Sequence, residues 1–180
     1  VKIVSTKYEE GEKMKKITAI AIVAVAFSFG LVSLASAVPI TLSVGDAFYV
    51  GSINDGIPSN PSAEVVFIND LISLAPGAGD TTIGSETYNR EGSTLAGLAE
   101  AVLGGSTKTT NDPVSNIFDA TGFDYILGKY DAHNAGSLVW YLGDNFTGTV
   151  ALPVSFLNPD TERSYGLSHI SAYNAVPEPS

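Results

Sequence analysis

The residues from Val38 to Ser180 contain only short apolar stretches, and chain-breaking residues separate them. Only Gly11 and Gly30 of the 18 glycines precede this segment, and all 9 prolines lie within it. Glycine and proline are unfavourable inside helices, so few helices of ordinary length fit between them. Short apolar stretches that end at turn-forming residues are typical of strands, so the pattern predicts a mainly β domain.

Six segments have the features of strands. Some alternate apolar and polar residues, as on a sheet with one solvent-exposed face, and others combine aromatic with β-branched residues. Pro153 within one segment predicts an edge strand or a bulge, because proline cannot donate a backbone hydrogen bond. The glycine-containing loop between the third and fourth segments predicts a hairpin. The predicted strands are 40–44, 47–53, 123–130, 137–142, 148–154 and 165–174.

Strict alternation along 165–174 places Leu167 and His169 on one face of the strand and Ile170 on the other. The domain 38–174 is therefore expected to be an antiparallel β-sandwich with one short inserted helix. A barrel is the alternative arrangement for such strands.

The inserted helix is predicted over 61–75. Asn60 has the character of an N-cap, Pro61 suits the first turn, and apolar residues follow at helical spacing until Pro76. The segment 95–103 also has apolar residues at helical spacing and ends at two glycines, so we interpret it as a second helix. A short apolar run of this kind is also compatible with a strand.

The apolar run 17–34 is the longest in the chain. A short basic segment precedes it, and the small residues Ala35 and Ala37 follow it. This order is typical of a secretory signal peptide, so we predict that signal peptidase removes residues 14–37 and that the mature protein begins at Val38. The alternative is a permanent transmembrane anchor, since the run just reaches the length of a membrane span.

Residues 1–13 precede the basic segment at which a signal peptide normally begins. The codons of Glu9-Glu10-Gly11 are able to contain the purine run of a bacterial ribosome-binding site, shortly before Met14. We therefore interpret 1–13 as an untranslated upstream extension and Met14 as the start. A genuine, longer basic segment is the alternative.

Charge and composition exclude several functions. The chain has 9 Lys and Arg, 19 Asp and Glu, and no Cys. From Val38 onward 4 basic and 16 acidic side chains remain, so the net charge of the mature protein is about −12. An acidic surface repels phosphates, so we predict no nucleic-acid partner. The absence of Cys excludes disulfides, thiol catalysis and Cys-type zinc sites.

The two histidines, His133 and His169, lie in patterns that do not indicate catalysis. Neighbouring residues on a strand point to opposite faces, so Ser168 and His169 cannot form a nucleophile–base pair. The sequence contains no G-x-S-x-G motif and no pair of His residues at metal-binding spacing. We therefore predict no catalytic residue, no cofactor and no enzyme activity.

Two groups of residues near the predicted hairpin are candidate binding residues. Aspartates that flank the strands are able to gather into a calcium site at one end of a sandwich, although aspartate is also an ordinary turn residue. Aromatic residues of the hairpin form either a sugar-stacking surface or part of the core. The calcium candidates are Asp112, Asp119, Asp124, Asp131 and Asp144, and the sugar-stacking candidates are Tyr125, Tyr130, Trp140 and Tyr141.

The chain ends in Val176-Pro177-Glu178-Pro179-Ser180. The two prolines around Glu178 prevent a helix and favour an extended segment that fits the groove of an enzyme. After an exported β-rich domain, this motif resembles the start of a PEP-CTERM sorting signal. The segment 166–174 and the predicted hairpin also resemble the final part of exported proteins that carry the signal. A proline-rich linker is the alternative.

The resemblance implies a route for the protein. In the PEP-CTERM family the motif precedes an apolar span and a basic cluster, and an exosortase, a membrane-embedded transpeptidase-like enzyme, processes the tail. Such proteins occur in Gram-negative bacteria that make exopolysaccharide. The resemblance therefore implies that 175–180 begin the sorting segment, that the chain is truncated after Ser180, and that an exosortase and an exopolysaccharide are partners.

Together these features predict an exported, non-enzymatic protein of the cell surface or of an extracellular biofilm matrix. The first alternative is a carbohydrate- or calcium-binding extracellular module in the same location. The second alternative is a secreted hydrolase.

Overall fold

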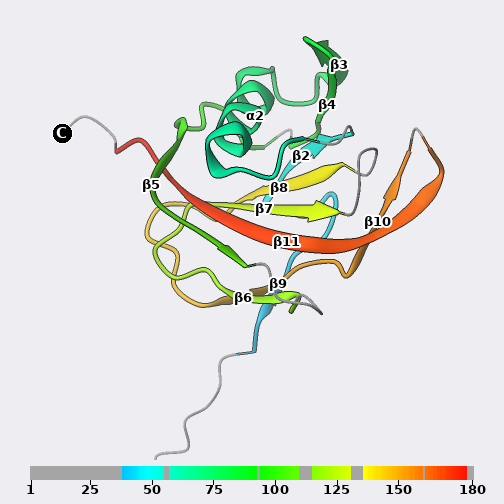
Figure 1. Cartoon of the computed structure of the whole chain (residues 1–180). Helices are drawn as coiled ribbons and strands as arrows, with labels where there is room; N and C mark the ends of the chain where they lie inside the picture. The colour runs from blue at the N-terminus through cyan, green and yellow to red at the C-terminus, as the bar shows by residue number, and fades with distance from the viewer. Residues whose placement is uncertain are drawn as a thin grey trace, which may run out of the picture. The chain divides into compact units, whose positions relative to one another are not determined.

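The computed structural model describes residues 38–54, 57–92, 94–109, 115–130, 136–159 and 161–177, which lie within one compact unit. The predicted signal peptide, the segment before it and Glu178–Ser180 lie outside the described residues. The elements are β1 (Ile40–Thr41), β2 (Tyr49–Ile53), α2 (Pro61–Ser73), β3 (Gly79–Ile83), β4 (Glu86–Arg90), β5 (Ala101–Thr109), β6 (Ile117–Asp119), β7 (Tyr125–Tyr130), β8 (Ser137–Tyr141), β9 (Thr149–Ala151), β10 (Ser155–Asn158) and β11 (Arg163–Ala175) (Figure 1).

The strands form two sheets. The larger has the order β10-β11-β7-β8-β2-β4-β3, with β5 paired to β11, and all its pairs are antiparallel. The smaller has the order β1-β9-β6 and includes the parallel pair β1–β9. The mainly β, sandwich-like prediction with one helix is confirmed, and the parallel pair is an exception to its antiparallel pattern.

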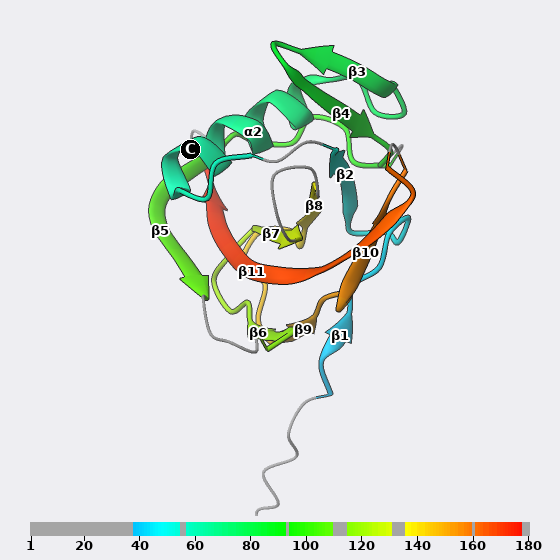
Figure 2. The same ribbon diagram turned by 45° about the vertical axis from the view of Figure 1, so that its right-hand side comes forward.

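The larger sheet separates two apolar cores, because successive residues of a strand point to opposite faces. On one side its side chains pack with those of the smaller sheet, including Trp140 of β8 and Val150 of β9. On the other side Val139 of β8 packs with Ile68 and Leu71 of α2. Figures 1 and 2 show the same order of layers, with α2 and the β6–β9 region on opposite sides of β7 and β11.

The predicted hairpin is confirmed as β7 and β8, which pair from Tyr125↔Tyr141 to Lys129↔Ser137. The helix begins at the predicted residue, with the Asn60 side chain accepting a hydrogen bond from the Ala63 amide. It ends two residues earlier than predicted, because Leu74 already has an extended backbone. Within the described residues no helix has the length and apolar character that a membrane crossing requires.

The prediction of a second helix over 95–103 is wrong. Residues from Ala101 onward form β5, which pairs with β11. The backbone of β11 provides hydrogen-bond partners for β5, and the local apolar spacing does not reveal them. The Ala101 amide at the start of β5 also donates to the Asn69 side chain of α2. Pairing with distant residues therefore outweighs the helical spacing.

Two details of the predicted strands are also wrong. The pairing of β11 with β7 shifts between Leu167 and His169, which is the signature of a β-bulge. Leu167 consequently packs in the same core as Ile170, while His169 faces α2. Pro153 is neither on an edge strand nor in a bulge, because β9 ends at Ala151 and lies in the centre of the smaller sheet.

Candidate functional site

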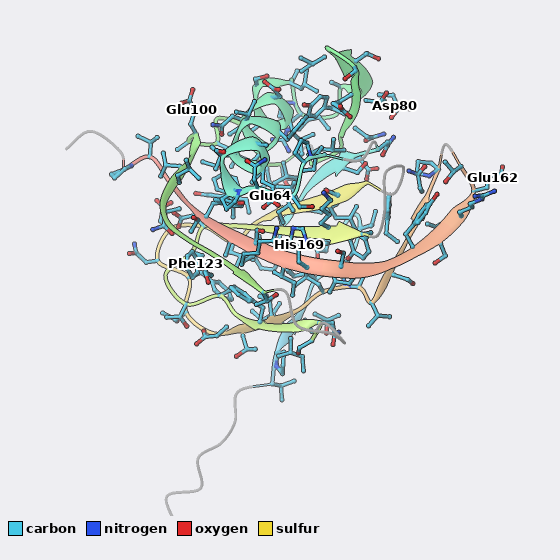
Figure 3. The ribbon with its side chains drawn as sticks, viewed as in Figure 1. Glu64, Asp80, Glu100, Phe123, Glu162 and His169 are labelled. Atoms are coloured by element: carbon cyan, nitrogen blue, oxygen red, sulfur yellow. The ribbon has the colours of Figure 1, made fainter. Side chains whose placement is uncertain are left out.

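A group of polar side chains is buried between α2 and the larger sheet. Glu64 of α2 has no exposed surface, and its Oε1 lies 3.0 Å from Nε2 of His169. The Tyr173 hydroxyl donates to Glu64 Oε2 at 2.5 Å. Figure 3 shows Glu64 and His169 close together at the boundary between α2 and β11. The bulge in β11 makes this arrangement, since it turns His169 towards the helix.

Two lysines lie beside this carboxylate. Lys108 of β5 places Nζ 3.6 Å from Glu64 Oε1 and 2.7 Å from the Ser59 carbonyl oxygen. Lys129 of β7 donates to the Ile57 carbonyl and, at 2.6 Å, to the Ser59 hydroxyl. Both cations thus hold the segment that precedes α2.

Burial raises the pKa of the Glu64 carboxyl, but hydrogen bonding, above all from His169, and the electrostatic effect of the His169 ring outweigh it and lower the pKa to about 2. Burial also lowers the pKa of the Lys129 ammonium. His169 retains 3 % of its surface, so a substrate cannot reach it. We therefore interpret the group as a charged contact that holds the helix against the sheet. The side-chain partner of His169 in this contact is Glu64 and not the neighbouring Ser168.

A hollow of about 600 Å³ lies at the other candidate site, where β8 and β11 end. Its walls come from the segment 94–99, from the loop after β8, and from the end of β11 with Val176 and Pro177. Asp124, Tyr141 and Asp144 line it. Among the described residues, these three are the only predicted binding residues that the structure brings together at one place on the surface.

The contacts of these three residues define the chemistry of the hollow. The Tyr141 hydroxyl donates to Asp144 Oδ1 at 2.9 Å, and the Ala175 amide donates to Asp124 Oδ2 at 2.7 Å. The Tyr141 ring lies against that of Tyr125, with 5.0 Å between the ring centres. The hollow thus combines an aromatic ring with two carboxylates that can accept further hydrogen bonds.

The predicted sugar-stacking surface is wrong for three of its four residues. Tyr125, Tyr130 and Trp140 have no exposed surface and pack in the two cores, so they cannot stack on an external sugar. Only Tyr141 is half-buried and lines the hollow.

Of the calcium candidates, Asp124 and Asp144 line the hollow, whereas Asp119 lies on β6. Asp119 is exposed on β6, and its Oδ1 accepts from the Thr121 amide, which is ordinary turn chemistry. Asp112, Asp131 and the candidate histidine His133 lie outside the described residues. Within the described ranges no three His, Asp or Glu side chains are arranged to hold a metal ion.

The predicted sorting motif begins where the domain ends. The Val176 amide donates to the Glu100 carbonyl at 2.7 Å, and Pro177 lines the hollow. The remaining motif residues, Glu178, Pro179 and Ser180, lie outside the described residues, as do Ala35 and Ala37 of the predicted cleavage site.

Several residues that shape these sites were missed by the sequence analysis. Arg90 is 1 % exposed and donates to the Val50 and Leu95 carbonyls, and Lys129 is 8 % exposed. Only 4 basic residues follow Val38, and their rarity was the available signal. A charged residue within an otherwise apolar strand, as Lys129 is in β7, requires a buried partner.

Comparison of the chain with known protein families, with curated proteins and with solved structures gave no match.

Proposed function

We propose that the protein is an exported, non-enzymatic component of the cell surface or extracellular matrix, whose C-terminal motif is processed by an exosortase-type membrane enzyme. The observation that carries the proposal is the Val-Pro-Glu-Pro-Ser motif directly after the last strand. Because β11 ends at Ala175, the motif begins at the first residue after the sheet.

Three further features support the proposal. The compact unit begins at Ala37, next to the predicted cleavage site before Val38. His169 is buried and held by Glu64, so this histidine is not accessible as a base for a hydrolase. Of the 4 basic residues after Val38, Arg90 and Lys129 are buried and Lys108 is half-buried, so the surface is strongly acidic and unsuited to anionic polymers.

The test is cell fractionation in a bacterium that has an exosortase, with the gene extended by its own downstream codons. Replacing Pro177, Glu178 and Pro179 by Ala should keep the protein in the membrane fraction, while the original protein reaches the surface or the medium. The matched control replaces the exposed Pro58 and Glu91 by Ala, and it should be sorted normally. Normal sorting of the motif variant would refute the proposal.

A further inference from the structure

We propose that the hollow at the ends of β8 and β11 binds a neutral saccharide. A pocket of several hundred cubic ångströms with a few converging polar groups is the usual form of a small-ligand site. This hollow measures about 600 Å³ and contains an aromatic ring and two carboxylates, from Tyr141, Asp124 and Asp144.

The walls of the hollow are held in place before any ligand arrives. Arg90 donates from Nη2 to the Leu95 carbonyl at 2.5 Å and from Nη1 to the Val50 carbonyl at 2.8 Å, which ties the segment 94–99 to β2. The Tyr125 hydroxyl donates to the Ala99 carbonyl at 2.5 Å. Both anchors are buried, so the wall that faces Tyr141 loses little conformational entropy on binding.

The side chains in the hollow match the chemistry of a sugar. The C–H face of a pyranose ring packs against an aromatic ring, and its hydroxyls donate to carboxylate oxygens. One oxygen of Asp144 accepts a hydrogen bond from the Tyr141 hydroxyl, and one oxygen of Asp124 accepts a hydrogen bond from the Ala175 amide. We assign the second oxygen of each carboxylate to ligand hydroxyls.

Charge and coordination number select against anionic ligands and against Ca²⁺. An anionic ligand would be repelled by the two carboxylates in the hollow. Among the described residues, Arg163 is the only basic residue that is exposed. A divalent cation such as Ca²⁺ takes six to eight oxygen ligands, yet no three acidic or His side chains form a metal-binding group in the described ranges. A neutral hydrogen-bond donor fits both observations.

The test is a titration of the purified protein with neutral glucan and mannan oligosaccharides up to about 1 mM. Binding is measured by NMR chemical-shift changes and by saturation transfer. At least one oligosaccharide should bind. Tyr141→Ala should weaken that binding about tenfold or more, whereas Tyr141→Phe, which keeps the ring, should stay within about threefold. The matched control Tyr165→Ala removes another half-buried tyrosine, outside the hollow, and should bind as the original protein does.

Asp144→Asn keeps the size of the side chain, and it should weaken binding several-fold even if Tyr141→Ala does not fold. Absence of binding to every oligosaccharide would overturn the proposal. Equal effects of Tyr141→Ala and Tyr165→Ala on sugar binding would also overturn it. So would NMR shifts at Asp124 and Asp144 that appear on addition of CaCl₂ but not on addition of any sugar. The titration uses no sorting enzyme, so its outcome is independent of the proposed route of export.

Discussion

Glu64 shows how a single buried charge is tolerated in this protein. Removing a carboxylate from water is costly, and neutralisation by a proton would be the usual response. Here three side chains surround the carboxylate and stabilise its ionised form. His169 Nε2 lies 3.0 Å and Lys108 Nζ 3.6 Å from Glu64 Oε1, and the Tyr173 hydroxyl lies 2.5 Å from Oε2. The residue therefore remains charged in the folded protein although its side chain is fully buried.

This arrangement predicts a loss of stability in acid. The pKa of Glu64 is about 2 in the fold, below the reference value of 4.5, so its ionised form stabilises the fold above pH 4.5. The contribution is lost as the pH falls through about 2, and the difference in pKa corresponds to roughly 3 kcal/mol. Urea unfolding should show that Glu64→Gln is less stable than the original at neutral pH and that the two converge in acid.

The control for this experiment is Glu91→Gln, which removes an exposed acid of the same type. Its unfolding free energy should follow that of the original protein at every pH. A constant gap between the original protein and Glu64→Gln from pH 5 to pH 2 would show that Glu64 contributes by packing and not by its charge.

Gly51 is a residue at which a neighbouring backbone leaves no room for a side chain. A Cβ atom there would lie 2.1 Å from the Asn89 carbonyl oxygen, at the pairing of β2 with β4. Because a backbone atom cannot give way cheaply, Gly51→Ala should destabilise the protein by about 3 kcal/mol or more. Gly104→Ala is the matched control, since no atom lies within 4 Å of its Cβ position. Thermal unfolding of the two variants measures the difference, and equal melting temperatures would contradict the close approach.

At the scale of elements, α2 depends on a local signal at its start. Asn60 Oδ1 accepts from the Ala63 amide at 2.9 Å and from the Ser62 hydroxyl at 2.7 Å. Asn60→Ala leaves the amide without this acceptor, so we expect a loss of about 1 kcal/mol of unfolding free energy. Asn60→Asp retains a capping oxygen and should unfold close to the original in urea. A variant Asn60→Ala as stable as Asn60→Asp would show that the cap is dispensable.

The elements also show which signals could be predicted. The Asn60-Pro61 start of α2 and the β7–β8 hairpin follow from neighbouring residues, and both predictions are confirmed. The first residues of β5, 101–103, were predicted as the end of a helix from their apolar spacing, and the true partner, β11, lies some seventy positions away in the sequence. The bulge before His169 has no local signal, since alternation continues through it.

At the scale of the whole molecule, the two cores share their central strands. In β8, Leu138 and Trp140 pack towards the smaller sheet while Val139 packs towards α2. In β7, Ile126 and Leu127 divide in the same way. Loss of either core removes one side of the same strands, so neither core is stable without the other.

We therefore expect one cooperative unfolding transition for residues 38–177. Leu152→Ala truncates a residue of one core and Ile68→Ala a residue of the other, and each should cost about 2–5 kcal/mol. Trp140 fluorescence and far-ultraviolet circular dichroism should give coincident urea transitions in both variants. Separate transitions of the two signals in the Ile68→Ala variant would show that the helix layer unfolds independently.

The candidate sites depend on contacts between distant parts of the chain. Tyr141, Asp124 and Asp144 were among many candidates in the sequence, and only the fold brings them to one hollow with the end of β11. The tyrosines and the tryptophan that looked equally suited to a sugar are buried, because composition does not say which face of a strand meets a core.

By itself, the sequence determined what short-range interactions decide: a mainly β class from the spacing of glycine and proline, one helix from its N-cap, and a hairpin from two neighbouring strands. Only the tertiary structure decided the partner of β5, the bulge in β11 and the burial of Glu64. Glu64 and His169 are 105 positions apart. Their contact exists because a curved sheet and a helix bury them together, and such burial is a property of the assembled chain and not of either segment.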